Sequence, residues 1–317
     1  RQNIGFVISL YAGTSICLII CGKSAGNYNV TNSLLSFVIS RFIRTSETLR
    51  DILPNNLIHI NHNKPNDKEF GSYLAGLWEA DGHASSSQQI IITFCEQDKY
   101  FAQSLANLFE HGNLYNIKNK KAVNWVISNK TGIIKFLNLI NGHIRIERKL
   151  IQIRTNLNSY LPFCTPFQSQ VNTSSLLQSY WLAGFTDGDG SFYIQIITRK
   201  LIKRKPEVRL HFKFSLKDYE IIEQLSSTFG SSLSIRKHPN GSITYYWSST
   251  SFTSALKVHN YFHTYSLQSS KWLNFLKWRK AFILFYKNFH LSEEGLKKII
   301  KIKNSLNSKS PRPSDAG

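Results

Sequence analysis

A short pattern that occurs twice constrains this chain more than any other feature of its sequence. Residues 74–82 read LAGLWEADG, and residues 182–190 read LAGFTDGDG. After each copy the periodicity changes in the same order, from two strand patterns to a helix, then to a hairpin and further helices. The repeat therefore predicts two similar subdomains in one chain of 317 residues.

The strand patterns predict that each subdomain contains an antiparallel sheet with one covered face. Residues 191–196 (SFYIQI) and 209–217 (RLHFKFSLK) alternate apolar side chains with polar ones. Helical patterns at 98–110 and 218–229 follow the strands and supply the cover. We therefore expect an α+β fold.

Two further local signals lie in the second copy. The Asn240-Gly241 pair between two strand patterns is expected to form a two-residue hairpin turn. Residues 292–306 (SEEGLKKIIKIKNSL) predict a capped amphipathic helix that the first copy lacks.

Composition and the repeat together divide the chain into five segments. We expect a leader at 1–66, a first subdomain at 67–160, an uncharged linker at 161–178, a second subdomain at 179–307 and a disordered tail at 308–317. The leader has an apolar run at 5–21 and no acidic residue before Glu47. That composition is typical of an organellar transit segment.

The net charge of +20 predicts a polyanionic partner, either nucleic acid or an anionic membrane surface. Residues 179–307 carry 20 Lys and Arg against 8 Asp and Glu, so most of the excess lies inside a patterned segment and not in a tail. A folded, positively charged face is favoured over lysines spread on every side. Four scattered cysteines are too few for a disulfide framework.

Small residues recur at a four-residue spacing in both motifs, at Gly76, Ala80, Gly184 and Gly188. This spacing lets two helices approach closely, so we expect these residues to form the interface between subdomains. Asp81 and Asp189 would then emerge together at the negative ends of two helix dipoles. Two carboxylates in that position need a cation, and hard divalent ions prefer oxygen ligands.

Both motifs resemble that of the LAGLIDADG homing endonucleases, and two copies in one chain resemble the monomeric, pseudo-symmetric branch of that family. The resemblance covers about residues 67–307. It implies two αββαββα subdomains whose sheets form a saddle over the DNA major groove. It also implies an intron-encoded endonuclease that cuts both strands of a long asymmetric DNA site as a monomer, with Mg²⁺ or Mn²⁺.

The resemblance also implies roles for particular residues. It assigns catalysis and metal binding to Asp81 and Asp189, with the carbonyl groups of Ala80 and Gly188 completing the coordination. Glu79 and Asp187, the earlier acidic positions of the motifs, are not expected to be catalytic.

Members of this family place a basic residue near the scissile phosphates, at the start of a late helix. Lys271 is the equivalent in the second copy, and Lys149, with Arg148 beside it, is the candidate in the first. The expected DNA contacts lie in the second copy, at Tyr193, Gln195, Arg199, Arg209, His211, Lys213, Lys217 and Arg236. The first copy lacks such basic outward positions, so we expect its contribution to DNA binding to be weaker.

Two other functions remain open from the sequence. An RNA maturase that assists splicing of its host group I intron has the same motifs, because some members of the family are maturases or do both. A basic membrane-surface protein anchored by residues 5–21 leaves both motifs unexplained. Members translated in frame with an upstream exon commonly belong to mitochondrial genes, so a mitochondrial location is favoured over a chloroplast one.

Overall fold

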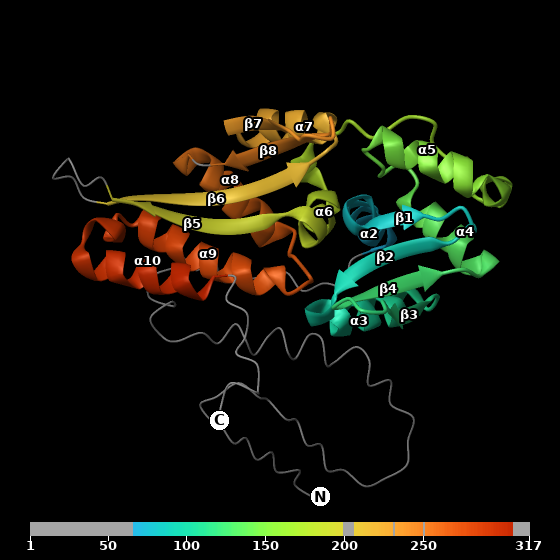
Figure 1. Cartoon of the computed structure of the whole chain (residues 1–317), viewed down its shortest axis with the longest axis horizontal. Helices are drawn as coiled ribbons and strands as arrows, with labels where there is room; N and C mark the ends of the chain where they lie inside the picture. The colour runs from blue at the N-terminus through green and yellow to red at the C-terminus, as the bar shows by residue number, and fades with distance from the viewer. Residues whose placement is uncertain (1–65, 199–205, 231, 250, 307–317) are drawn as a thin grey trace, which may run out of the picture. The chain divides into compact units, whose positions relative to one another are not determined.

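The computed structural model describes residues 66–198, 206–230, 232–249 and 251–306 (Figure 1). The expected leader up to residue 65, the expected tail and the candidate DNA contact Arg199 lie outside the described residues. Two successive sets of helices and strands follow the order that the repeat predicts.

The first set begins with the helix of the first motif. Its elements are α2 (Asp67–Asp81), β1 (Gly82–Ala84), β2 (Ile90–Cys95), η3 (Glu96–Asp98), α3 (Lys99–Phe109), β3 (Asn113–Asn116), β4 (Ala122–Ile127), α4 (Lys130–Ile140), α5 (Glu147–Asn156) and η4 (Asn158–Phe163).

The second set repeats this order and adds a final helix. Its elements are η5 (Leu176–Gln178), α6 (Trp181–Asp189), β5 (Ser191–Ile197), β6 (Glu207–Leu216), α7 (Tyr219–Phe229), β7 (Ser232–Lys237), β8 (Ile243–Ser249), α8 (Phe252–Thr264), α9 (Lys271–Tyr286), η6 (Phe289–Leu291) and α10 (Glu293–Ser305).

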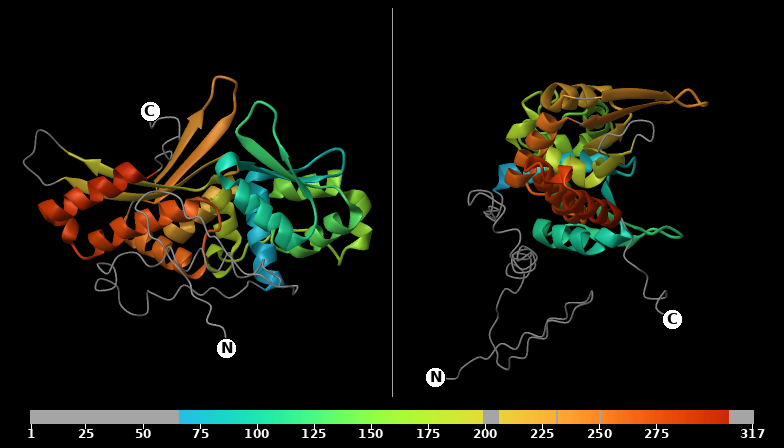
Figure 2. Two further views of the ribbon diagram at one scale, coloured as in Figure 1. Left: turned by 90° about the horizontal axis from the view of Figure 1, so that it is seen from below. Right: turned by 90° about the vertical axis from the view of Figure 1, so that its left-hand side faces the viewer.

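Within the described residues, each half holds a four-stranded antiparallel sheet, in the orders β1-β2-β4-β3 and β5-β6-β8-β7. The helices of each half gather on one face of its sheet (Figure 2). This arrangement confirms the α+β fold of two similar halves.

Strand alternation decides which face of each sheet is buried. Along β2 the buried residues are Ile90, Ile92 and Phe94, and along β6 every second residue from Val208 to Leu216 is buried. The inward faces also carry Trp125 and Trp247, both almost fully buried. The intervening residues of β6 face outward, so its polar side chains remain on the open side of the sheet.

The hairpin between β7 and β8 differs from the expected two-residue turn. The carbonyl oxygen of His238 accepts a hydrogen bond from the Gly241 N–H (2.9 Å), and the His238 N–H donates to the Ser242 carbonyl (2.8 Å). The loop therefore contains three residues, Pro239 to Gly241. Proline fixes φ at the second position of the turn, and Gly241 supplies the left-handed residue with φ +78°.

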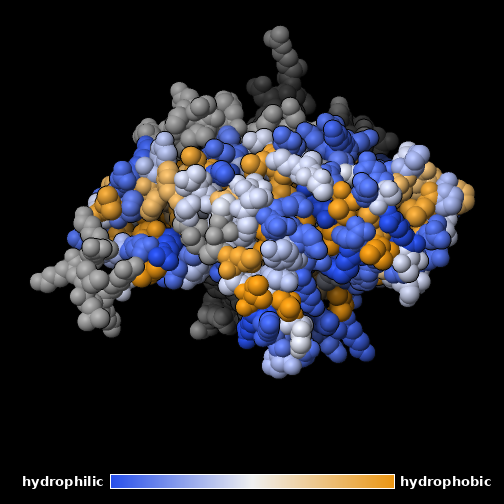
Figure 3. Space-filling view, turned by 90° about the horizontal axis from the view of Figure 1, so that it is seen from above, coloured by the Kyte–Doolittle hydropathy of each residue, from blue (hydrophilic) through white to orange (hydrophobic). Residues whose placement is uncertain are grey.

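Helix α10 confirms the amphipathic helix expected at the end of the second half. Its N-cap Ser292 accepts a hydrogen bond from the Gly295 N–H (3.0 Å), and Ile299 is buried against the rest of the half. None of the helices in the described part of the chain is long and apolar enough to cross a membrane. On the face drawn in Figure 3, polar and apolar side chains are interspersed.

Candidate active site at the paired motif helices

The two motif helices, α2 and α6, pack directly against each other through glycine. A Cβ atom at Gly76 would overlap the carbonyl oxygen of Trp181, and one at Gly184 would overlap the carbonyl oxygen of Tyr73. The contact is reciprocal, because each helix presents a glycine to the backbone of the other. Only residues without a side chain allow the two backbones to approach this closely.

The carboxyl-terminal ends of the same helices also meet. Gly188 packs against the Ala80 side chain, and a Cβ at Gly188 would lie 3.1 Å from Oδ2 of Asp81. Asp81 is the last residue of α2, and Asp189 is the last residue of α6. Both predicted catalytic carboxylates therefore lie at one end of the helix pair.

This position opposes the ionised form of the carboxylates. Burial, with the negative charge of Asp81 as the second cause, raises the pKa of Asp189 to about 6. Burial also raises the pKa of Asp81, although the charges of Lys271 and Lys149 act in the opposite direction. Each residue is nevertheless exposed on its outer side, so a cation has access.

The donor set fits a hard divalent cation. Among the described residues, no group of three or more His, Cys, Asp and Glu side chains is arranged to hold a metal ion. The available ligands are therefore the two carboxylates and neighbouring main-chain oxygens. An oxygen-only set with two negative charges is the kind that Mg²⁺ and related ions use.

Two lysines approach the ends of the motif helices in matching ways. Lys149 of α5 donates from Nζ to the carbonyl oxygens of Trp78 (3.3 Å) and Gly82. Burial lowers its pKa to about 8. The Trp78 carbonyl also accepts a hydrogen bond from the Gly82 N–H, so the ammonium group of Lys149 lies against the last turn of α2 and the start of β1.

Lys271, the first residue of α9, does the same at the end of α6. Its Nζ donates to the carbonyl oxygens of Thr186 (3.1 Å) and Gly188, and burial lowers its pKa. The carbonyl of Gly188, a predicted metal ligand, thus accepts a hydrogen bond from a predicted catalytic residue. Both lysines lie beside the carboxylate pair.

The inner acid of the first motif is a buried structural centre that the sequence analysis did not identify. Glu79 accepts hydrogen bonds from Nε1 of Trp181 (2.5 Å) and from the N–H groups of Arg145 (2.9 Å) and Ile146 (2.6 Å). Burial raises its pKa to about 7. Glu79 thereby connects α2 to α6 and to the segment that leads into α5.

Asp187 has the equivalent role in the second motif. It accepts hydrogen bonds from the Tyr73 hydroxyl (2.6 Å), the Gln268 N–H (2.8 Å) and the Ser269 hydroxyl (2.5 Å). Burial raises its pKa. The available sequence signal was the recurrence of an acid two residues before Asp81 and before Asp189.

The predicted DNA contacts on β5 and β6 form one outward-facing row. Tyr193 pairs with His211 and Gln195 with Arg209 across the two strands. His211 is also hydrogen-bonded to Gln195 (3.1 Å), and the Lys213 ammonium lies 4.5 Å from the centre of the Tyr193 ring. The two remaining described candidates, Lys217 after β6 and Arg236 on β7, are exposed.

The outer face of the first sheet has a different composition. Strands β1 to β4 contain no Lys or Arg, and the outward residues Thr93 and Asn124 are hydrogen-bonded to each other (2.9 Å). Tyr115, which pairs with Asn124, is exposed. Nearby positive charge comes from Lys118, Lys120 and Lys121 in the β3–β4 hairpin and from Lys99, whose Nζ donates to Oδ1 of Asn116 (3.4 Å).

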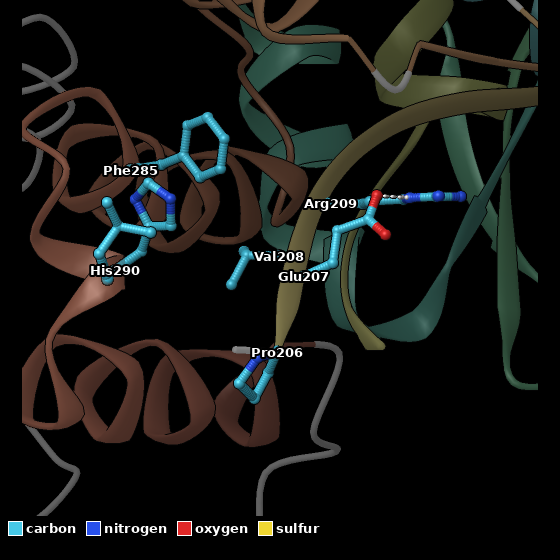
Figure 4. Close-up of a pocket in the computed structure, with 7 residues that line it drawn as sticks. Pro206, Glu207, Val208, Arg209, Phe285 and His290 are labelled. Carbon is cyan, nitrogen blue, oxygen red and sulfur yellow. Dashed lines mark hydrogen bonds and ion pairs between the residues drawn. The ribbon is translucent and has the colours of Figure 1, made fainter. Parts of the chain in front are cut away.

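A surface pocket of about 540 Å³ lies at the other end of the second half (Figure 4). Phe285 and His290 stack on one side, with ring centres 4.2 Å apart, and the first residues of β6 line the other. Arg209 forms an ion pair with Glu207 at its edge (2.7 Å). Neither the carboxylates of the motif helices nor Lys149 and Lys271 line this pocket.

Known proteins resemble the chain in both sequence and fold. A family model described as LAGLIDADG endonuclease matches residues 182–282. The chain is 37% identical to the uncharacterized cox1 intron-2 37.2 kDa protein of Schizosaccharomyces pombe, over 94% of this chain and 97% of that protein. It is 29% identical to the intron-encoded DNA endonuclease aI3 of Saccharomyces cerevisiae, over 70% of this chain and 65% of that protein.

Among solved structures, the I-LtrWI LAGLIDADG homing endonuclease bound to target DNA has the same fold. Its TM-score is 0.58 at 20% identity, and the match covers 77% of this chain and 99% of that one. The full-length relationship to the Schizosaccharomyces pombe protein, the family model and the paired motif helices agree. The chain therefore belongs to the LAGLIDADG endonuclease family, in the form that carries both motifs in a single polypeptide.

Proposed function

We propose that the protein is an intron-encoded homing endonuclease that acts as a monomer and cuts both strands of duplex DNA at the insertion site of its intron. The observation that carries this proposal is the meeting of Asp81 and Asp189 at the ends of two packed helices, each flanked by a lysine. A relative named as an intron-encoded DNA endonuclease supports the same activity.

In this proposal Asp81 and Asp189 hold a divalent ion, Mg²⁺ in the first instance, with main-chain oxygens of the motif ends. When bound, such an ion lowers the pKa of a water molecule and stabilises negative charge on the phosphate and the leaving oxygen. The two carboxylates would supply the negative charge that balances the ion. Burial raises the pKa of both carboxyl groups and so disfavours their ionised form, and a nearby cation would offset this effect.

Lys149 and Lys271 place fixed positive charge beside this position. Each ammonium is held by carbonyl oxygens at the end of a motif helix, so little reorganisation is needed when a phosphate arrives. Burial lowers the pKa of Lys149 to about 8, so its ammonium group releases a proton more readily than that of a free lysine.

The outer faces of the two sheets form the proposed DNA-binding surface. On the second sheet, Arg209 and Lys213 supply charge for phosphates, and Gln195 and His211 supply hydrogen-bonding groups for base edges. The first sheet offers mainly neutral groups, so we propose that its half contributes less to affinity. Recognition of DNA bases by the first sheet would rely on neutral outward residues such as Asn124 and Tyr115.

The direct test is cleavage of a duplex that spans the intronless insertion site. With Mg²⁺ we expect a double-strand cut, and we expect no cut when EDTA is present or when the intron interrupts the site. Asp81→Asn and Asp189→Asn should each abolish the double-strand cut while retaining binding in a gel-shift assay. Glu293→Gln, at an exposed ion pair of α10, is the matched control and should cut normally. Normal cutting by either aspartate variant would show that the substituted aspartate is not part of the active site.

A maturase function is the second candidate, because a basic sheet face neutralises RNA phosphates as well as DNA phosphates. The carboxylate pair favours the nuclease, since RNA folding has no need of it. A splicing assay with the precursor of the host intron separates the two. A mitochondrial location is part of the proposal, and fractionation of the host cell with an antibody against the protein tests it.

A further inference from the structure

Asp98 and Asp218 occupy equivalent places in the two halves, one residue before α3 and one residue before α7. An aspartate at that position ordinarily accepts a hydrogen bond from the first turn of its own helix. Neither side chain does so here. Both carboxylates instead accept hydrogen bonds from the opposite half, and Oδ2 of Asp98 also accepts one from Sγ of Cys95 in its own half (3.1 Å).

Asp98 of the first half contacts the start of α9 in the second half. Its Oδ1 accepts a hydrogen bond from the Ser270 N–H (2.8 Å), and its Oδ2 accepts one from the Ser270 hydroxyl (3.2 Å). Asp98 is only 9% exposed. Ser270 immediately precedes Lys271, so this contact fixes the start of the helix that carries the lysine. A carboxylate is also favoured there by the dipole of α9.

Asp218 of the second half makes the matching contact with the first half. Its two oxygens accept hydrogen bonds from Nη2 (2.9 Å) and Nε (3.2 Å) of Arg148. Arg148 immediately precedes Lys149. A two-point contact of this kind fixes orientation as well as distance.

Each lysine segment is thus held from two sides. Glu79 binds the backbone before Lys149 from within the first half, and Asp187 binds the backbone before Lys271 from within the second. Asp218 and Asp98 add the contact from the opposite half. The arrangement repeats in both halves although the contacted residue changes from arginine to serine.

We propose that Asp98 and Asp218 are positioning residues through which each half sets the place of the other half's lysine. The inference rests on the proposed nuclease function, because the readout is strand cutting. Displacement of a reacting group by about 1 Å can lower a rate by a hundredfold, so loss of one contact should affect one reaction centre more than the other.

The test uses the full chain at saturating concentration and a target duplex labelled at both 5′ ends, so that each strand is followed separately. Asp98→Ala should slow the cut that depends on Lys271, and Asp218→Ala should slow the cut that depends on Lys149. We expect the ratio of the two strand rates to shift in opposite directions, on the order of tenfold. Because both strands belong to one bound duplex, a change in affinity cancels in the ratio.

Two controls distinguish positioning from loss of folding. Glu110→Ala breaks a surface ion pair with Lys135 inside the first half and should leave the ratio unchanged. The charge exchange Asp218→Arg with Arg148→Asp rebuilds the pair in reverse and should return the ratio toward that of the unaltered protein. Thermal melting of each variant confirms that it is folded.

The outcomes separate the two proposals. If the unaltered protein cuts and both alanine variants slow the two strands equally, the positioning role is overturned while the nuclease function stands. If the charge exchange fails to restore the ratio, Asp218 does not act through Arg148. If the unaltered protein cuts neither strand, the nuclease function is wrong and this inference is lost with it.

Discussion

The hydroxyl of Tyr73 donates a 2.6 Å hydrogen bond to the buried carboxyl group of Asp187 on the opposite motif helix. Trp181 and Glu79 form the mirrored contact at 2.5 Å. The inner acids of the two motifs are therefore each bound by an aromatic residue from the other half. This reciprocal pair explains why the motif has an acid that the proposed chemistry does not use.

Tyr73→Phe removes the donor and keeps the ring. We expect the free energy of unfolding to fall by about 1–3 kcal/mol, because a buried acceptor loses a partner. Denaturant titration at pH 7 measures the change. Tyr115→Phe alters an exposed tyrosine and should change stability by less than about 0.5 kcal/mol. Equal stability of the Tyr73 variant and the unaltered protein would contradict the structural role of the contact.

The raised pKa of Asp189 makes the metal-free protein less stable as the pH rises. The folded pKa is about 6 against an ordinary 3.8, so the folded protein keeps a proton that the unfolded chain has released. This contribution is fully present below the ordinary value and is lost as the pH rises through the folded value. Asp189→Asn does not titrate, so it should not lose this stability. The amount by which its unfolding free energy exceeds that of the unaltered protein should therefore increase as the pH rises from 3.8 to about 6.

Mg²⁺ provides the matched measurement for the same residue. At pH 7 we expect added Mg²⁺ to raise the melting temperature of the unaltered protein, because an ion that binds only the folded state stabilises it. Asp189→Asn should show a smaller rise. The same rise in both proteins would place the ion elsewhere.

His259 predicts an opposite dependence on pH. It lies buried on α8 with its ring 5.0 Å from that of Phe282, and burial lowers its pKa to about 4 from 6.5. Stability from the neutral ring is present above pH 6.5 and lost as the pH falls toward 4. His259→Phe should remove this part of the acid sensitivity, on the order of a few kcal/mol. Parallel stability curves for the two proteins would contradict it.

The unequal outer faces of the sheets predict unequal effects on DNA affinity. Lys213→Ala on β6 should weaken DNA binding. It should also reduce the salt slope, which is the slope of log binding constant against log salt concentration, by the equivalent of about one phosphate contact. Thr93→Ala, at an outward position of β2, should leave the salt slope unchanged. Fluorescence anisotropy with a labelled target between low and moderate salt measures both slopes. Identical slopes for Lys213→Ala and the unaltered protein would exclude a phosphate contact at this position.

Local patterns predicted the order of the main helices and strands in both halves. The alternation in β6 identified the buried face because strand side chains change sides at every residue. The repeated small residues indicated a close helix pair, and the structure places Gly76 and Gly184 against the opposite backbone. The hairpin prediction was wrong because Pro239, which defines the turn, was not included in it.

The supporting contacts of the site could not be predicted in the same way. Asp98 and Ser270 are 172 residues apart in sequence, and Arg148 and Asp218 are 70 apart. No local pattern joins them. Only the packing of the two halves shows that these aspartates leave their own helices without a side-chain cap.

The glycine contact between α2 and α6 has a consequence for chimeric proteins. Because each motif helix fills the space that the other leaves empty, neither half carries a complete interface of its own. A hybrid that joins one half of this chain to half of a relative must match the backbone contacts at Gly76 and Gly184 together. Successful recombination should therefore follow compatibility at these two positions more closely than overall sequence identity.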